Sequence, residues 1–232
     1  MAMDYQLKKH MKKIRAIVFD FDGTLTPLTL NFVHLRTEIL KIAEQYATKD
    51  VLKDLKGLEG FLVIEMIYAI DDALYNHEGS QEFKNKAFER LRELEVEAAV
   101  GKDLFPYTRK TLKSLKDRSI KTGIITRSCL DVLKTVFPDI FDYIDNVVTR
   151  DDIKHVKPHV DHVNKILKMM DIPGENTLTV GDHPTDIMAG KAAGTYTAGV
   201  LTGRTLKDAF EGVGATYVLN DISEILMLET LK

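Results

Sequence analysis

The sequence predicts an α/β fold in which helices cover a parallel sheet and a helical module interrupts it. Three observations support this fold: short apolar runs alternate with helical patterns, polar residues follow several of these runs, and one long stretch has no strand pattern. Right-handed crossovers bring the ends of parallel strands to one edge of the sheet, so we expect the polar residues to gather there.

The strands and core helices follow from the spacing of apolar residues. The six predicted strands span residues 14–20, 121–126, 146–149, 176–181, 196–201 and 217–219. Two helices are predicted between them because apolar residues recur there at helical spacing. These helices span residues 107–117 and 160–170.

The inserted module is predicted from the absence of a convincing strand in residues 28–100. Its apolar residues recur at helical spacing, which indicates helices packed on one another. The expected helices span residues 32–46, about 58–76 and 81–97. We therefore expect a sheet core from residues 1–27 and 101–232, and a movable helical cap over the polar strand ends.

Composition limits the classes of function. The chain has 232 residues, enough for one large or two modest domains, and a net charge of -3, which argues against a nucleic-acid or membrane-surface binder. No apolar stretch approaches the length that spans a membrane. Cys129 is the only cysteine, which excludes an internal disulfide and fits the reducing cytoplasm.

The segment Asp20-Phe21-Asp22-Gly23-Thr24 follows the first predicted strand. Two carboxylates this close together are costly unless a cation or a proton separates them. Carboxylate oxygens suit Mg²⁺, and an Asp can also act as a nucleophile or move a proton. An isolated pair of this kind would indicate only a capped turn.

Three later segments strengthen the functional interpretation. Thr126 ends another apolar run, Lys157 precedes a helix start, and Asp182 with Asp186 follows a third run. These residues are expected at the same sheet edge as the first acidic pair.

Three histidines and the cysteine receive a structural interpretation. His155, His159 and His162 surround a helix start, and the spacing of His159 and His162 is not that of a helical zinc site. We expect a solvated helix face there. Cys129 is expected to be a small buried or half-buried residue.

Together, D-x-D-G-T, a strand-end Thr, Lys-Pro and G-D-x-x-x-D resemble the haloacid dehalogenase-like (HAD) hydrolase superfamily. More narrowly, the chain is similar to the phosphoglycolate phosphatase-like members, which carry a helical cap after the first motif. The resemblance implies a Rossmann-like parallel core. Family members often have Asn where this chain has Arg127.

The resemblance also implies catalytic roles. Asp20 would be the nucleophile that forms an aspartyl-phosphate, and Asp22 the general acid and then base, with its backbone carbonyl on Mg²⁺. Thr126 would hydrogen-bond the transferring phosphoryl group, and Lys157 would neutralise charge on this group and on Asp20.

The remaining implied roles concern metal and substrate binding. Asp182 would hold Mg²⁺ together with Asp20, and Asp186 would be a further ligand or support one. Backbone N–H groups around Gly23 and Thr24 could form an anion-binding nest. Arg127 could pair with a second anionic group of the substrate. Arg36 could do the same, although a surface ion pair is the simpler interpretation.

The sequence therefore predicts a cytoplasmic, Mg²⁺-dependent phosphatase, monomeric or homodimeric, that acts on a small phosphorylated metabolite. A phosphosugar mutase similar to β-phosphoglucomutase fits the same core motifs. A 2-haloacid dehalogenase is disfavoured because it needs neither a metal nor an acid at Asp22. A binding module on a retired hydrolase fold would not need the complete motif set.

Overall fold

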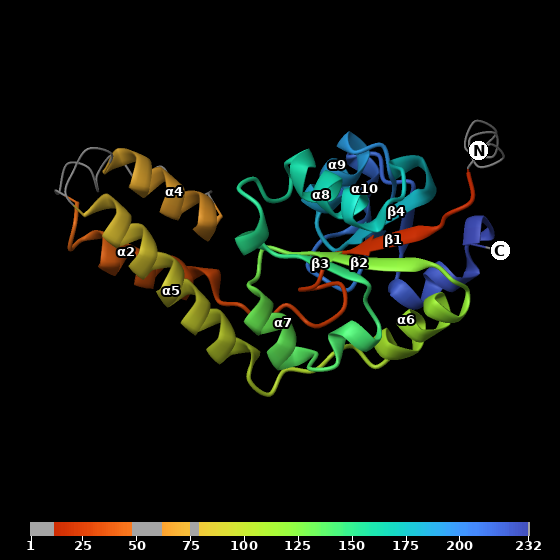
Figure 1. The fold of residues 1–232 in the computed structure, drawn as a ribbon, viewed down its shortest axis with the longest axis horizontal. Coiled ribbons are helices and arrows are strands. Elements are labelled where there is room, and N and C mark those ends of the chain that lie inside the picture. The colour runs from red at the N-terminus through yellow and green to blue at the C-terminus, as the bar shows by residue number, and fades with distance from the viewer. Residues whose placement is uncertain (1–11, 48–61, 75–78, 232) are drawn as a thin grey trace. The chain divides into compact units, whose positions relative to one another are not determined.

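The computed structural model describes residues 12–47, 62–74 and 79–231 (Figure 1). The chain divides into two compact units. We call Met1–Leu28 with Gly101–Lys232 the sheet unit, and Thr29–Val100 the helical unit.

The sheet unit contains a six-stranded parallel sheet, which confirms the predicted α/β class. Its strands are β1 (Ala16–Phe19), β2 (Lys121–Ile125), β3 (Asn146–Val148), β4 (Thr177–Gly181), β5 (Tyr196–Val200) and β6 (Tyr217–Leu219). The spatial order is β3-β2-β1-β4-β5-β6, so the direction of strand addition reverses between β1 and β4. Open α/β sheets bind ligands at such a switch point.

Helices cover both faces of this sheet, with α8, α9 and α10 on one face and α6 and α7 on the other (Figure 1). They are α6 (Thr108–Asp117), α7 (Leu130–Val136), α8 (Val160–Met170), α9 (Pro184–Ala192) and α10 (Lys207–Gly212). Short 3₁₀ helices lie at η2 (Ile140–Asp142), η3 (Arg150–Asp152), η4 (Gly174–Asn176), η5 (Ile222–Met227) and η6 (Glu229–Leu231). All four residues of β1 are buried, as expected for a central strand covered on both faces.

The helical unit has its own apolar core. Its described helices are α2 (Phe32–Ala43), α4 (Val63–Ala73) and α5 (Ser80–Ala99). Ile39, Ile67 and Leu91 come from these three helices and pack in one cluster. The helix predicted over 58–76 extends at both ends beyond the residues that the structure describes. In the described part of this unit, no strand interrupts the helices.

A membrane-spanning helix would need a long apolar run, and none of the described helices has one of sufficient length and hydropathy.

Candidate active site

The two strands at the switch point each end in an acidic residue. Asp20 follows β1 and Asp182 follows β4, and these strands pair in parallel with Phe19 beside Val180. The Asp20 backbone N–H donates to the Val180 carbonyl at 2.8 Å, which continues the pairing by one residue. The structure thus brings together two residues that are 162 positions apart (182 − 20), and buries both.

The loop after β1 is shaped by Gly23. Its φ is +93°, in the left-handed region that favours glycine, and its N–H donates to the Thr26 carbonyl at 2.7 Å. A Cβ at Gly23 would lie 2.2 Å from Asp182 Oδ2, so the position is closed to other residues for a second reason. The Thr24 N–H donates to the Phe21 carbonyl at 3.3 Å. The amides expected to bind an anion at Gly23 and Thr24 therefore serve the loop itself.

Lys157 lies between two of the carboxylates. Its Nζ is 2.6 Å from Asp20 Oδ1 and 2.6 Å from Asp186 Oδ1, and the side chain is buried. Burial opposes the charge on Lys157, but the carboxylates of Asp186 and Asp20 outweigh this effect and raise the pKa of the ammonium group. Lys157 therefore stays charged between them.

The backbone of Lys157 is held on both sides. Its N–H donates to Nδ1 of His162 at 3.2 Å, and its carbonyl accepts from Nε and Nη2 of Arg127 at 3.1 and 2.8 Å. Nη2 of Arg127 also donates to Thr185 Oγ1 at 3.0 Å. The Arg127 guanidinium is thus engaged with the protein, which indicates that it positions the Lys157 segment.

The expected solvated face at His162 is wrong, because this side chain is fully buried. Burial and the nearby charge of Lys157 lower the pKa of His162 to about 4. A neutral imidazole can accept at Nδ1 while Nε2 donates to the Val148 carbonyl at 3.1 Å. The predicted helix is present, but the packing of α8 on β2 and β3 turns this residue inward.

Three buried carboxylates form a potential metal site. Ligand oxygens of Asp20, Asp182 and Asp186 lie within 4.8 Å of one another. Burial raises the pKa of Asp182 to about 8, with Asp20 and Asp186 adding to the effect, and burial raises that of Asp20 to about 6 although Lys157 opposes it. A cation would relieve this crowding of negative charge, and the all-oxygen donor set fits Mg²⁺.

Asp186 connects this cluster to helix α9. Its Oδ2 accepts from the His183 backbone N–H at 3.1 Å, closing the first turn of the helix. Its Oδ1 is buried and lies 2.6 Å from the Lys157 ammonium group, so this oxygen already faces a positive charge.

Asp22 occupies a separate, less buried position. Its Oδ1 accepts from Lys102 Nζ at 2.6 Å and its Oδ2 from Ser128 Oγ at 2.7 Å. Thr126 lies beside this group, with its Oγ1 accepting from the Ser128 N–H at 3.0 Å. One carboxylate of the acidic pair therefore faces Lys157 and the other faces a different lysine.

Sequence reasoning missed four contributors to the site. Lys102 and Ser128 donate hydrogen bonds to the Asp22 carboxylate. The Thr202 hydroxyl donates to the Gly23 carbonyl at 2.5 Å. Gly203 lies against Asp182, where a Cβ would come within 2.0 Å of Oδ2. Ser128 had a usable signal, since it lies two residues after a strand-end Thr. The others have none, because they reach the site only through tertiary structure.

Comparisons with known proteins show which family the chain resembles. The sequence profile of haloacid dehalogenase-like hydrolases matches residues 14–194. Pyrophosphatase PpaX of Bacillus mycoides (strain KBAB4) is 30% identical over 231 residues, covering 92% of this chain and 96% of the relative.

Two solved structures share the fold. A protein described as a haloacid dehalogenase-like hydrolase from Bacteroides fragilis has a TM-score of 0.67 at 23% identity, covering 92% of this chain and 100% of its own. A predicted phosphoglycolate phosphatase from Haemophilus somnus 129pt has a TM-score of 0.62 at 18% identity, covering 94% and 98%.

Proposed function

Because the chain belongs to the haloacid dehalogenase-like hydrolase family and is a hydrolase of the phosphatase type, we propose that it hydrolyses a small phosphomonoester in a Mg²⁺-dependent reaction. The observation that supports this most strongly is the buried Asp20 carboxylate, paired with Lys157 and clustered with Asp182 and Asp186. A carboxylate so placed is suited to attack phosphorus and form an aspartyl-phosphate.

In the first step, an oxygen of Asp20 would bond to phosphorus while the bond to the leaving oxygen breaks. Asp22 would protonate that leaving oxygen, so the product departs as an alcohol. In the second step, Asp22 would accept a proton from water, the water oxygen would bond to phosphorus, and the bond to Asp20 would break. Phosphate is released and both aspartates return to their initial state.

Charge stabilisation would come from groups that the structure already orders. Lys157 would neutralise the phosphoryl oxygens, and the Thr126 hydroxyl, whose oxygen accepts from Ser128, has its proton to donate to one of them. Asp20, Asp182 and Asp186 would hold Mg²⁺ with the Asp22 backbone carbonyl. When bound, the ion would supply positive charge that offsets the repulsion between nucleophile and phosphoryl group.

Lys102 and Ser128 would orient Asp22 between its two proton transfers. Each contacts a different oxygen of that carboxyl group, so its plane is fixed. Lys102 also lies at the return of the chain from the helical unit, next to Gly101. We infer that the helical unit, inserted between β1 and β2, is the cap that selects the leaving group.

Pyrophosphate is a second candidate substrate, favoured by the 30% identity to a protein named pyrophosphatase PpaX. Its leaving group is itself a phosphate, which needs less protonation than an alkoxide. The proposed residues would serve both substrates without a change of role.

A substrate panel tests the proposal. Pyrophosphate, phosphoglycolate and an aryl phosphate are assayed with Mg²⁺, with chelator, and with Ca²⁺ in place of Mg²⁺. We expect chelator to abolish turnover and Mg²⁺ to restore it, with Ca²⁺ poorly active because its looser coordination misplaces the nucleophile. The ratio of kcat/KM for pyrophosphate and phosphoglycolate decides between the two substrate classes.

Variants sharpen this test. Asp182→Ala should raise the Mg²⁺ concentration needed for activity or abolish activity, whereas the exposed control Asp117→Ala should not. Full activity in chelator, especially on a chloro acid, would support dehalogenation instead. Transfer of the phosphoryl group to a second sugar position, without release of phosphate, would support the mutase alternative.

A further inference from the structure

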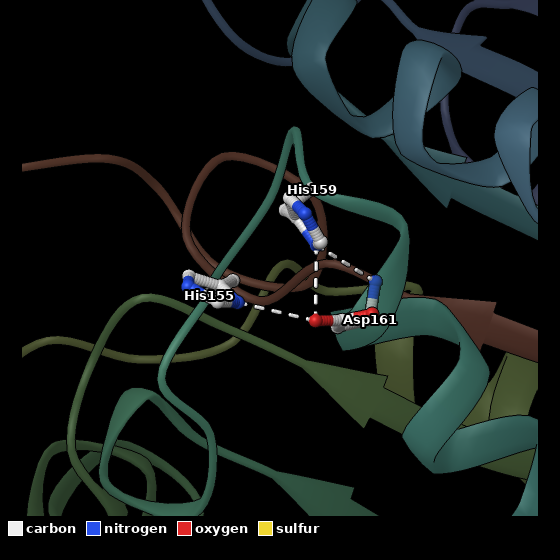
Figure 2. Close-up of side chains that lie close together, drawn as sticks. All are labelled: His155, His159 and Asp161. Atoms are coloured by element: carbon white, nitrogen blue, oxygen red, sulfur yellow. Dashed lines mark hydrogen bonds and ion pairs between the residues drawn. The ribbon is translucent and has the colours of Figure 1, made fainter.

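A second cluster of potential metal ligands lies on the surface, in the segment that carries Lys157. Nδ1 of His155 and Nδ1 of His159 each lie 3.2 Å from the same oxygen, Oδ2 of Asp161 (Figure 2). The two imidazole rings are 4.7 Å apart between centroids, and the three ligand atoms lie within 4.8 Å of one another. No residue of this group belongs to the proposed catalytic set.

We propose that His155, His159 and Asp161 bind a Zn²⁺-type transition-metal ion at a site distinct from the Mg²⁺ cluster. Two imidazole nitrogens with one carboxylate oxygen are a donor set that suits zinc and is unsuited to Mg²⁺, which takes oxygen ligands. The inference concerns metal binding alone and does not depend on the proposed catalytic reaction.

The distances fit a tetrahedral ion. With ligand bonds of about 2.0–2.1 Å, two ligand atoms of a tetrahedral zinc site are separated by about 3.3 Å. Both nitrogen-to-oxygen distances, at 3.2 Å, are already close to this value. Both histidine side chains are about half exposed (51% each), which leaves them free to rotate toward an ion.

The local backbone brings the ligands together without a regular helical pair. His159 is the N-cap of α8, with Nδ1 accepting from the Asp161 N–H at 3.3 Å, and Asp161 lies in the first turn. His155 reaches Asp161 from the preceding loop (Figure 2). A bound ion would use the Nδ1 lone pair of His159, so the hydrogen bond from the Asp161 N–H would be lost. The bonds to the ion would instead connect the loop to α8. Exposure leaves room for water as the fourth ligand.

A calorimetric titration tests the proposal. Zn²⁺ is added to the full chain in saturating Mg²⁺, which occupies the carboxylate cluster, and Co²⁺ is added in a parallel experiment as a spectroscopic probe. We expect one Zn²⁺ per chain and visible Co²⁺ absorption of the four-coordinate type. His155→Ala and His159→Asn should each weaken Zn²⁺ binding by more than about tenfold. Loss of a residue that only supports a metal ligand already costs about tenfold, so loss of the ligand itself should cost more.

Two design features protect the test. His159→Asn retains an N-cap oxygen, so its effect is not loss of the helix start. His34→Ala removes an exposed histidine elsewhere and should bind Zn²⁺ as the unmodified chain does. The proposal is overturned if Zn²⁺ does not bind in saturating Mg²⁺, if both site variants retain full affinity, or if His34→Ala weakens binding equally.

Discussion

The two units of the chain bury different kinds of side chain. The sheet unit buries Asp20, Lys157, Asp182 and Asp186 at one edge of its sheet. Over residues 29–47, 62–74 and 79–100, which the structure describes in the helical unit, Glu95 is the buried charged residue and the rest of the core is apolar. Burying a charged group costs free energy of folding. This cost arises at the switch point of the sheet unit and is largely absent from the helical unit.

This difference teaches where substitutions should act. In the sheet unit, replacing a buried charged residue should reduce chemistry more than stability, because functional sites are commonly maintained against stability. In the helical unit, a core substitution should act on stability through packing.

The largest effect is expected for Asp20→Asn. The amide is nearly isosteric but not nucleophilic, so kcat should fall by more than about 10⁴-fold. Because burial raises the pKa of this carboxyl to about 6, the neutral amide should leave the denaturation midpoint unchanged or higher. Steady-state assays measure kcat, and urea denaturation measures the midpoint. Substantial turnover in a sample shown by mass spectrometry to be free of deamidation would exclude the aspartyl-phosphate mechanism.

The next largest effect is expected for Asp22→Asn. Loss of the proton transfer should reduce kcat for an alkyl phosphate by about 10²–10⁴-fold, and less for an aryl phosphate, whose leaving group needs less protonation. Lys102→Met, which keeps the carboxyl group but removes its partner, is the matched control and should lose less on both substrates. Equal losses on the two substrates in Asp22→Asn would contradict the general-acid role.

In the helical unit, Ile67→Ala should lower the free energy of unfolding by about 2–5 kcal/mol, because it leaves a cavity at a fully buried position. Val33→Ala, at an exposed position of the same unit, should change it by less than about 0.5 kcal/mol. Urea denaturation followed by circular dichroism compares them. Similar effects of the two substitutions would show that this apolar cluster does not carry the stability of the unit.

His162 predicts a pH effect on stability. Its folded pKa is lowered to about 4 from 6.5, so the unfolded chain takes up the proton first as pH falls. The stabilising contribution is complete above pH 6.5 and is lost between there and about pH 4, amounting to about 3 kcal/mol.

His162→Gln should therefore show a shallower fall in unfolding free energy across this range, measured in saturating Mg²⁺. The exposed His34→Gln is the control and should follow the unmodified chain. An unchanged slope in His162→Gln would mean that this imidazole does not stay neutral in the folded protein.

The smallest effect is expected for Arg127→Ala. Since its guanidinium holds the Lys157 carbonyl, kcat should fall by about tenfold, equivalent to about 1.4 kcal/mol, on anionic and uncharged-tail substrates alike. KM should change little, and Arg127→Lys should recover only part of the loss because it lacks the planar fork. A loss confined to a substrate with a second anionic group would assign Arg127 to substrate binding instead.

Local sequence signals predicted most of the fold. Each predicted strand contains one observed strand, because runs of apolar residues coincide with the buried strands of the sheet. The helix over 160–170 has its predicted bounds, because its apolar residues recur at helical spacing on the buried face. Helix α2 ends at Ala43, three residues before its predicted end, since the following residues form turns. Boundaries depend on such local hydrogen bonding more than on periodicity.

The site was less completely predictable. Asp20, Lys157, Asp182 and Asp186 come together because strand ends converge, which the alternation of strands and helices implies. Lys102 is an ordinary lysine in sequence, and only the return of the chain from the helical unit brings it to Asp22.

The central position of β1 has a consequence for how the protein is made. Residues Ala16–Phe19 pair with Lys121–Ile124 on one side and Thr177–Val180 on the other, so the first strand emerges from the ribosome long before either neighbour exists. The helical unit lies wholly within that interval, and its contacts join residues of one continuous segment, Thr29–Val100. Asp182 and Asp186 follow the last of these partners, so the carboxylate cluster can assemble only late in synthesis. The order of the strands along the chain therefore requires both partners of β1 before the buried carboxylates can come together.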